Sequence, residues 1–171
     1  LLRAGVALLY AHWEGFIKIS GTYYLKFVAH QGAKASELQP NFIAIKLKSR
    51  LAEASKSNKP SASAELIDFF CSKFGDRLRI PYKGIVNTES NLSSSVLREI
   101  VWTLGLDMVP FETKCHLIDS SLVERRNHIA HGNSLDINVD DYLELEQEVL
   151  ALLGIFRAQL ENAAVTNGYL R

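Results

Sequence analysis

Residues 125–132, Arg-Arg-Asn-His-Ile-Ala-His-Gly, gather the side chains in this sequence that are best suited to chemistry. Arg126 and His131 stand five positions apart, and Asn127 follows the arginine. An arginine carries a permanent charge and a fork of donors that can hold phosphate oxygens as negative charge develops. A histidine can exchange a proton near neutral pH with a ribose 2′-hydroxyl or a leaving 5′-oxygen. The grouping suits phosphodiester cleavage, with Arg126, His131 and Asn127 as candidate catalytic residues.

Helical geometry restricts how these residues can act together. At about 100° per residue, Asn127 and His131 are about 40° apart and share a face, whereas Arg126 and His131 are about 140° apart. The helix must therefore end or distort here, or two copies of the chain must combine their segments in a two-fold dimer. Gly132 makes an ending easy, because glycine permits the backbone angles that stop a helix.

The neighbouring residues have weaker claims to a role. Arg125 could contact phosphate or simply be solvated, and His128 is a further candidate for a substrate-binding or supporting role. His128 and His131 could bind a metal from one helix face, but no third ligand stands at a suitable spacing, so we expect neither a metal nor a cofactor. A structural interpretation also stays open, in which Arg126 and His131 interact with the carbonyls at a helix end and Asn127 caps it.

Composition narrows the class of protein. The 171 residues are 47% hydrophobic, which is enough for one domain with a sizeable core. Lysine plus arginine equals aspartate plus glutamate at 19 each, so RNA contact would need a local basic patch. Cys71 and Cys115 lack a CxxC partner and indicate reduced thiols in a cytoplasmic protein. Charged residues interrupt the apolar stretch 1–19, which predicts an amphipathic helix and neither a signal peptide nor a membrane span.

Apolar residues recur at three- and four-residue steps along most of the chain, which predicts an all-α bundle of about five to six helices in a single domain, 1–171. Trp13, Tyr23, Tyr24 and Trp102 are expected in its core stripes. We expect a polar surface loop near 55–62 and an irregular segment near 79–91. The predicted helices are a first one ended by Gly32, one after Pro40 with Asn41 as N-cap and Phe42, Ile45 and Leu51 inward, 65–74, 92–104, 111–130, and a long C-terminal helix capped by Asn138. The helix 111–130 is expected to present Leu117, Ile118, Leu122, Val123 and Ile129. The apolar stripe of the C-terminal helix is Tyr142, Leu145, Val149, Leu152, Phe156 and Leu160.

The segment Arg126-Asn127-His128-Ile129-Ala130-His131 matches the R-x4-H signature of HEPN domains, in the form that begins Arg-Asn. Other landmarks follow in order: residues 12–16 in the first helix, the Asn91-Leu92 segment leading to 104–106, and the closing long helix. Together they resemble the MAE_28990/MAE_18760-like subgroup of the HEPN superfamily over nearly all of the chain. The short motif alone is a weak signal, and its position between two helices of an all-helical domain makes it more specific.

This resemblance implies a HEPN-type bundle that forms a homodimer and cleaves RNA without a metal, leaving a 2′,3′-cyclic phosphate. Such proteins typically act as toxins or antiviral effectors in bacterial conflict systems, where an antitoxin or another regulatory partner protein can control them. One branch carries a tyrosine two residues after the histidine, which a nucleotidyltransferase antitoxin modifies, but position 133 here is Asn. The resemblance also gives Glu14 a supporting role, pairing with Arg126 or tuning His131, although a plain surface carboxylate fits equally well.

A second hypothesis belongs to a different class of function. The chain could be a noncatalytic helical module that binds RNA or a partner protein and keeps the motif as a structural helix end.

Overall fold

The computed structural model describes residues 1–56, 59–133 and 136–171. Within these ranges the chain forms seven α-helices and three shorter 3-10 or π-helical stretches, and no strand. Two isolated bridges, Lys34 with Arg77 and Leu38 with Leu170, are the extended pairings there. The predicted all-α class with a long C-terminal helix is therefore confirmed. None of the helices in the described ranges is both long and apolar enough to cross a bilayer.

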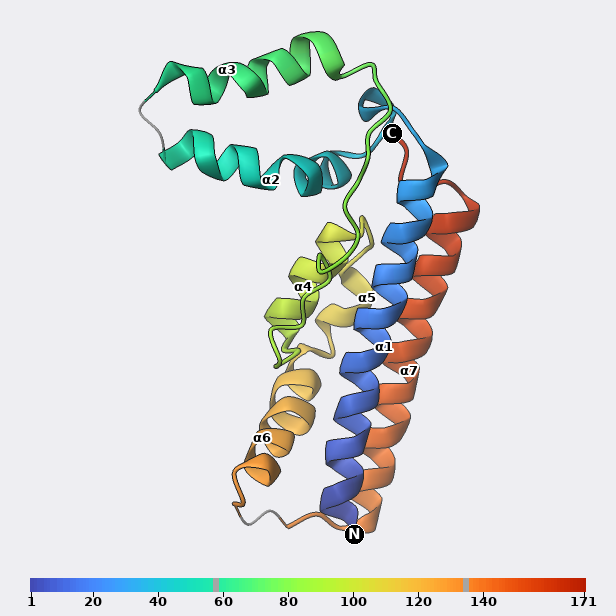
Figure 1. The fold of residues 1–171 in the computed structure, drawn as a ribbon. Helices are drawn as coiled ribbons and strands as arrows, with labels where there is room; N and C mark the ends of the chain where they lie inside the picture. The colour runs from blue at the N-terminus through green and yellow to red at the C-terminus, as the bar shows by residue number, and fades with distance from the viewer. Residues whose placement is uncertain (57–58, 134–135) are drawn as a thin grey trace.

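Two long helices form the spine of the molecule. Helix α1 (Leu2–Gln31) and helix α7 (Val139–Val165) lie side by side and run in the same direction (Figure 1). Helix α1 ends at Gly32, whose φ of 64° is the left-handed conformation that glycine adopts readily. Helix α7 begins at Asn138, whose side chain accepts a hydrogen bond from the Asp141 backbone N–H at 2.8 Å. Both of these predicted helix ends are confirmed.

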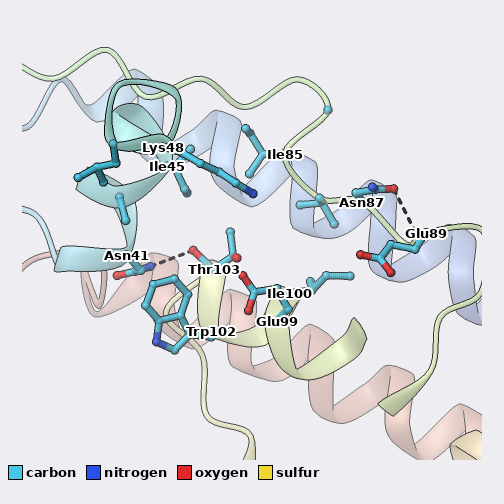
Figure 2. Close-up of a pocket in the computed structure, with 14 residues that line it drawn as sticks. Asn41, Ile45, Lys48, Ile85, Asn87, Glu89, Glu99, Ile100, Trp102 and Thr103 are labelled. Carbon is cyan, nitrogen blue, oxygen red and sulfur yellow. Dashed lines mark hydrogen bonds between the residues drawn. The ribbon is translucent and has the colours of Figure 1, made fainter. Parts of the chain in front are cut away.

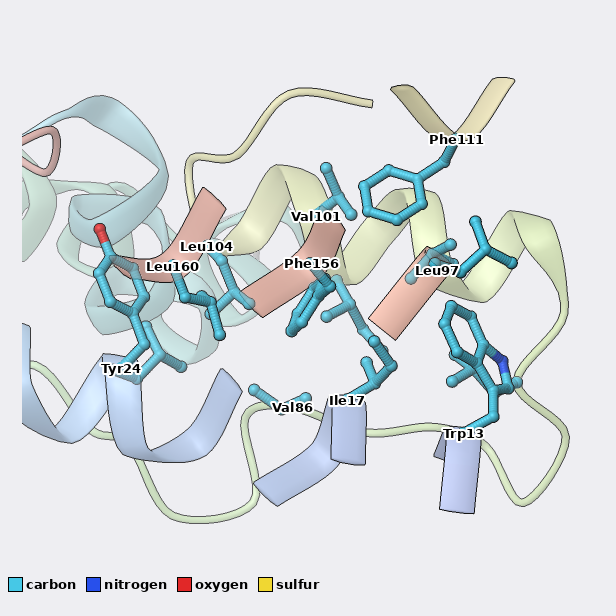
Figure 3. Packing of buried hydrophobic residues seen from close by; sticks show 14 of the residues in the cluster. Trp13, Ile17, Tyr24, Val86, Leu97, Val101, Leu104, Phe111, Phe156 and Leu160 are labelled. Atoms are coloured by element: carbon cyan, nitrogen blue, oxygen red, sulfur yellow. The ribbon is translucent and has the colours of Figure 1, made fainter. Parts of the chain in front are cut away.

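The core fills the space between this spine and α4 (Ser94–Thr103) with α5 (Val109–Glu112) (Figure 3). Trp13, Phe111 and Phe156 are among its largest fully buried side chains. The apolar stripe of α7 faces it, as its spacing predicted: Leu145, Val149, Leu152, Phe156 and Leu160 are all buried.

Two aromatic side chains expected in the core lie outside it. Trp102 is 56% exposed and Tyr23 is 66% exposed, whereas Trp13 and Tyr24 are buried as predicted. Neighbours on a helix point about 100° apart, so a residue beside a buried one can lie at the edge of the apolar stripe or outside it. Val101 and Tyr24 take the inward positions. The exposed Trp102 lies on the wall of a pocket described below.

Helices α2 (Pro40–Lys56) and α3 (Pro60–Asp68) form a hairpin that projects from the bundle (Figure 1). The predicted N-cap at Asn41 is wrong, because the helix already includes Pro40, whose fixed φ suits a first helical position. Asn41 is instead buried and donates to the Thr103 carbonyl at 2.9 Å. Leu51, expected inward, is 46% exposed, while Phe42 is buried and Ile45 partly buried.

The predicted polar loop near 55–62 is shorter in the structure, because α2 continues to Lys56 and α3 begins at Pro60; residues 57–58 lie outside the described ranges. Helix α3 continues into η2 (Phe69–Lys73), a π-helical stretch. A 3-10 turn, η1 (Ala35–Glu37), links α1 to α2. The segment 79–91, between η2 and α4, is irregular, and the buried side chains of Ile80 and Val86 anchor it in the core.

The helix expected over 111–130 is divided into three. Helix α5 ends at Glu112, η3 (Leu117–Glu124) is π-helical, and α6 (Arg125–Ala130) carries the motif. The apolar pattern correctly placed Ile118, Leu122 and Val123 in the core, but such a pattern does not show where helical hydrogen bonds change their span. The π-helical stretch supplies Asp119, whose carboxylate accepts from the Ser94 backbone N–H at 2.7 Å and from its hydroxyl at 2.6 Å. These hydrogen bonds connect the start of α4 to η3, the stretch directly before the motif helix α6.

Candidate functional site

Arg126 is the most firmly held residue of the motif. Its guanidinium carbon lies 4.0 Å from the ring centroid of Tyr10 on α1, a cation–π contact. Its Nη2 donates to the Ser90 carbonyl at 2.8 Å and more weakly to Asn91 Oδ1 at 3.4 Å. Helix α6 packs against α1, so both contacts join the motif to the spine.

The remaining nitrogens of Arg126 differ in their surroundings. Nε is buried and has no hydrogen-bond partner. The hydrogen bonds that the guanidinium makes to Ser90 and Asn91 both come from Nη2. One terminal nitrogen thus makes both of these hydrogen bonds, and the other takes no part in them. This is an arrangement in which a cation can hold an incoming anion.

The Ser90 carbonyl reaches Arg126 because of an unusual backbone turn. Glu89 and Ser90 have φ values of 54° and 58°, in the left-handed region that residues with a Cβ seldom adopt. Asn87 Oδ1 accepts from the Glu89 backbone N–H at 3.1 Å, which supports the turn from within. Leu92 closes it by donating its N–H to the Tyr10 hydroxyl at 2.7 Å. The turn is held between Tyr10 on α1 and Arg126 on α6.

Asn127 shares an acceptor with its neighbour. Its Nδ2 donates to the same Asn91 Oδ1 at 3.4 Å. Two of the three predicted catalytic residues thus meet at Asn91, which lies outside the motif. A shared acceptor of this kind orients both side chains relative to the 87–92 turn.

His131 occupies the opposite environment. It is the C-cap of α6, its side chain is exposed, and no hydrogen bond or ion pair involves its imidazole within the described ranges. Gly132 follows with a φ of 76°, and the backbone N–H groups of Gly132 and Asn133 bond back to the carbonyls of Ile129 and His128 at 3.1 and 2.9 Å. The helix therefore ends at the histidine as predicted, but the ending does not bring His131 into hydrogen-bonding contact with Arg126.

The supporting candidates are only loosely tied to this centre. His128 Nε2 lies 3.8 Å from Glu124 Oε1, one helical turn earlier. Arg125 is half-buried and makes no hydrogen bond or ion pair with the described residues. Glu14 is half-buried one turn from Tyr10, and it forms no ion pair within 4.0 Å of Arg126. The structure therefore places Glu14 near the site without the expected pairing.

Tyr10 forms a neutral platform beneath the arginine. Burial raises the pKa of its hydroxyl, and the negative charge of Glu14 adds to this, while the Leu92 N–H and Arg126 act in the opposite direction. The pKa ends above its ordinary value, so the phenol keeps its proton at neutral pH. Its role in the site is to support Arg126 and the 87–92 turn.

Sequence reasoning missed Tyr10, Ser90 and Asn91. Tyr10 lies three residues before Trp13 in the buried stripe of α1, and a buried tyrosine usually needs a partner for its hydroxyl, which was the available signal. Asn91 stands out in the sequence only as a landmark before α4. Its contacts with Arg126 and Asn127 span 35 and 36 residues, and no local pattern shows such a pairing.

The described residues contain no group of three or more His, Cys, Asp or Glu side chains arranged to hold a metal ion. His128 and His131 accordingly have no third ligand in this part of the chain. The site as described is a fixed guanidinium, an amide beside it and an exposed imidazole at the end of the same short helix.

The family model RiboL-PSP-HEPN matches the chain over residues 1–162. No curated protein and no solved structure is significantly similar to the chain. The match spans α1 to most of α7 and includes the whole motif. It supports the HEPN superfamily, while the finer assignment to the MAE_28990/MAE_18760-like subgroup is not confirmed by it. With nearly the whole helical bundle covered, the chain belongs to the RiboL-PSP-HEPN family.

Proposed function

We propose that this protein is an endoribonuclease that cleaves RNA by 2′-hydroxyl attack without a metal ion, with Arg126, His131 and Asn127 as its catalytic residues. Membership of the HEPN superfamily indicates an RNase-like or RNA-related function. The observation that supports metal-independent cleavage most strongly is the way in which the fold holds Arg126. Its guanidinium is fixed by Tyr10 and by Ser90, which it reaches through Nη2. It lies on the same short helix whose C-cap is the exposed His131, and no hydrogen bond or ion pair involves that imidazole in the described ranges.

The proposed reaction needs only groups of this kind. His131 accepts the proton of a ribose 2′-hydroxyl as its oxygen attacks the adjacent phosphorus. The bond from phosphorus to the 5′-oxygen breaks, and that oxygen takes a proton from water or from a second imidazole. Arg126 stabilises the negative charge on the nonbridging oxygens, and Asn127 orients the phosphate or the arginine. The products are a 2′,3′-cyclic phosphate and a free 5′-hydroxyl.

A homodimer is part of the proposal. Arg126 is half-buried against α1, whereas His131 is exposed and forms no hydrogen bond with it in the described ranges, so the pair is not joined within one chain. A two-fold axis beside α6 would place the histidine of one copy near the arginine of the other. Superfamily members often bind RNA and dimerise, which supports this assembly. The mass of the protein in solution tests it, and a strictly monomeric active enzyme would contradict it.

The biological role proposed here is that of a cytoplasmic toxin or antiviral effector, which an antitoxin or other regulatory protein would restrain. Toxicity on expression tests this role. We expect growth arrest with the wild type and none with His131→Ala at equal protein level. Arrest by both proteins would count against ribonuclease activity as its cause.

The decisive experiment for the chemistry is cleavage of single-stranded RNA in EDTA by the wild type, Arg126→Ala and His131→Ala. We expect the wild type to cleave, both variants to lose about 100-fold or more, and RNA with a 2′-deoxy sugar at the cut site to resist. Cyclic phosphate ends identify the reaction. Equal activity in all three proteins, or no activity of the wild type under any condition, would overturn the proposal.

One observation favours the noncatalytic alternative, a module that binds RNA or protein. Arg126 makes contacts that a purely structural arginine would make, with an aromatic ring and a backbone carbonyl. Loss of stability in Arg126→Ala therefore does not separate the two hypotheses. His131→Ala does, because its side chain is exposed and its imidazole makes no hydrogen bond or ion pair with the described residues. A catalytic histidine would lose activity at unchanged stability.

A further inference from the structure

A pocket of about 410 Å³ lies between α2, the segment 84–89 and α4 (Figure 2). This volume is within the range of small-molecule sites. Its apolar wall comes from Ile45, Ile85 and Ile100, and Trp102 closes one side. None of these residues belongs to the catalytic motif.

Three charged side chains border the pocket, and none of them has a partner among the described residues. Lys48 reaches over it from α2, Glu99 faces it from α4, and Glu89 stands at its end nearest the turn (Figure 2). No ion pair or side-chain hydrogen bond involves any of the three within the described ranges. One ammonium and two carboxylates thus border a largely apolar hollow without neutralising each other.

Trp102 is the second unusual feature of this pocket. An indole that is 56% exposed leaves a broad flat surface in water. Flat aromatic surfaces of this kind bind nucleic-acid bases by stacking, and single-stranded RNA is recognised in this way. The combination of a stacking surface with free charged groups indicates a planar, polar ligand.

We propose that this pocket binds a guanine base. The Watson–Crick edge of guanine carries two adjacent N–H donors, which match the two oxygens of one carboxylate, and its O6 accepts from an ammonium. Glu99 or Glu89 would accept from the donors, Lys48 would donate to O6, and Trp102 would stack on the ring. Bases without this paired donor edge would leave the carboxylates unsatisfied, and that gives the pocket its selectivity.

The position of the pocket suggests where the base comes from. Glu89 lines the pocket, and the next residue, Ser90, accepts a hydrogen bond from Arg126 through its carbonyl. The Cα atoms of Glu89 and Ser90 are consecutive and therefore about 3.8 Å apart, so the pocket lies close to the residue that holds Arg126. Helix α2 carries exposed cations without ion pairs in the described ranges, which could contact phosphates: Lys46, Lys48 and Arg50. A nucleotide near the scissile phosphate could therefore place its base here. This part of the inference, guanine as a subsite of the RNA substrate, rests on the proposed function.

Intrinsic fluorescence tests the pocket without requiring cleavage. The chain has two tryptophans; Trp13 is fully buried, so quenching by a stacked base reports on Trp102. We expect guanosine monophosphate to quench the emission of the wild type at lower concentration than adenosine, cytidine or uridine monophosphate. Trp102→Phe should leave only the unquenched Trp13 signal, and Glu99→Gln with Glu89→Gln should remove the preference for guanine. Absence of quenching, or equal quenching by all four nucleotides, would overturn the proposal.

A guanine-containing DNA oligonucleotide, which lacks the attacking hydroxyl, distinguishes the two sources of the base. Binding at least ten-fold tighter than that of the mononucleotide would identify an RNA subsite, whereas equal binding would identify a site for a free guanine nucleotide. In cleavage, Trp102→Ala should raise KM roughly ten-fold with a smaller change in kcat. Phe70→Ala, which removes a similarly exposed aromatic at 52%, is the matched control. An inactive wild type that still shows guanine-selective quenching would contradict the ribonuclease while leaving the pocket assignment intact.

Discussion

Arg126 and His131 lie at the two ends of one six-residue helix, α6, and their surroundings are opposite. The arginine is stacked on Tyr10, bonded to Ser90 and contains a buried nitrogen. The histidine caps the helix through its backbone only, and its ring has no partner in the described part of the chain. The fold therefore fixes the cation in place before any substrate binds. The orientation of the imidazole is left to the substrate or to a second copy of the chain.

Because of this difference, Arg126 and His131 should contribute very different amounts to the free energy of unfolding. A cation–π contact contributes about 0.5–2 kcal/mol and a charged hydrogen bond about 1.5–3 kcal/mol, and Arg126 makes both. The imidazole of His131 makes neither. If both residues are catalytic, their substitutions should therefore affect activity alike and folding differently.

The largest expected effect concerns activity alone. Replacing His131 with alanine removes the proposed proton acceptor, so cleavage of single-stranded RNA should fall by about 10²–10⁴-fold. The melting temperature should stay within a degree or two, because the backbone hydrogen bonds of the helix end remain. His128→Ala removes a partly exposed imidazole of the same helix that has at most a supporting role, so it should lose far less activity than His131→Ala. A loss of stability in His131→Ala as large as that in Arg126→Ala would break the comparison.

Arg126→Ala should lower both the cleavage activity and the free energy of unfolding. Loss of the stacking and of the bond to Ser90 should lower the free energy of unfolding by about 1–3 kcal/mol, as measured by urea denaturation. Arg126→Lys keeps the charge but not the planar fork, so it should recover only part of either property. Full recovery with lysine would mean that the charge alone matters and that the stacked geometry is incidental.

Asn91 connects the fixed side of the site to Asn127. Asn91→Ala removes the acceptor that Arg126 and Asn127 share, and we expect a loss of about 1 kcal/mol in stability and a fall in kcat smaller than that of Arg126→Ala. Asn87→Ala removes the support of the same turn without touching either motif residue, and serves as its control. Equal kcat values for Asn91→Ala and the wild type would remove Asn91 from the site.

The same contrast explains what the sequence could predict. Apolar spacing correctly gave the helical class, the stripe of α7 and the ends at Gly32 and Gly132, because these depend on residues close together in the chain. The motif was visible for the same reason. The position of His131 is set by the backbone of the helix end, which depends on neighbouring residues, and the predicted helix end at His131 is observed.

The environment of Arg126 was not predictable in this way. Its contacts come from Tyr10 on α1 and from the turn at Glu89 and Ser90. Both turn residues have a left-handed backbone although neither is a glycine, so nothing in the sequence indicated that conformation. The π-helical η3 also shifts the phase of the helix that leads into the motif, and apolar spacing does not report such a shift. Trp102 was misplaced in the core because spacing marks an apolar residue without telling whether a partner or a ligand covers it.

The smallest predicted effect concerns the platform beneath the arginine. Because burial raises the folded-state pKa of Tyr10, the unfolded chain loses this proton first as pH rises above about 10, and the folded state loses stability through that window. Tyr10→Phe lacks this titration, although it is less stable at neutral pH because the Leu92 N–H loses its acceptor. The gap in unfolding free energy between wild type and variant should therefore narrow from pH 9 to pH 12.

Tyr24, whose pKa burial raises to about 12, is present in both proteins and cancels in this comparison. Urea denaturation at each pH gives the gap directly. A gap that stays constant or widens would show that the Tyr10 hydroxyl titrates no later in the folded protein than in the unfolded chain. In that case the ring beneath Arg126 would be more accessible to water than its burial indicates, and the arginine would be held less firmly than the contrast with His131 requires.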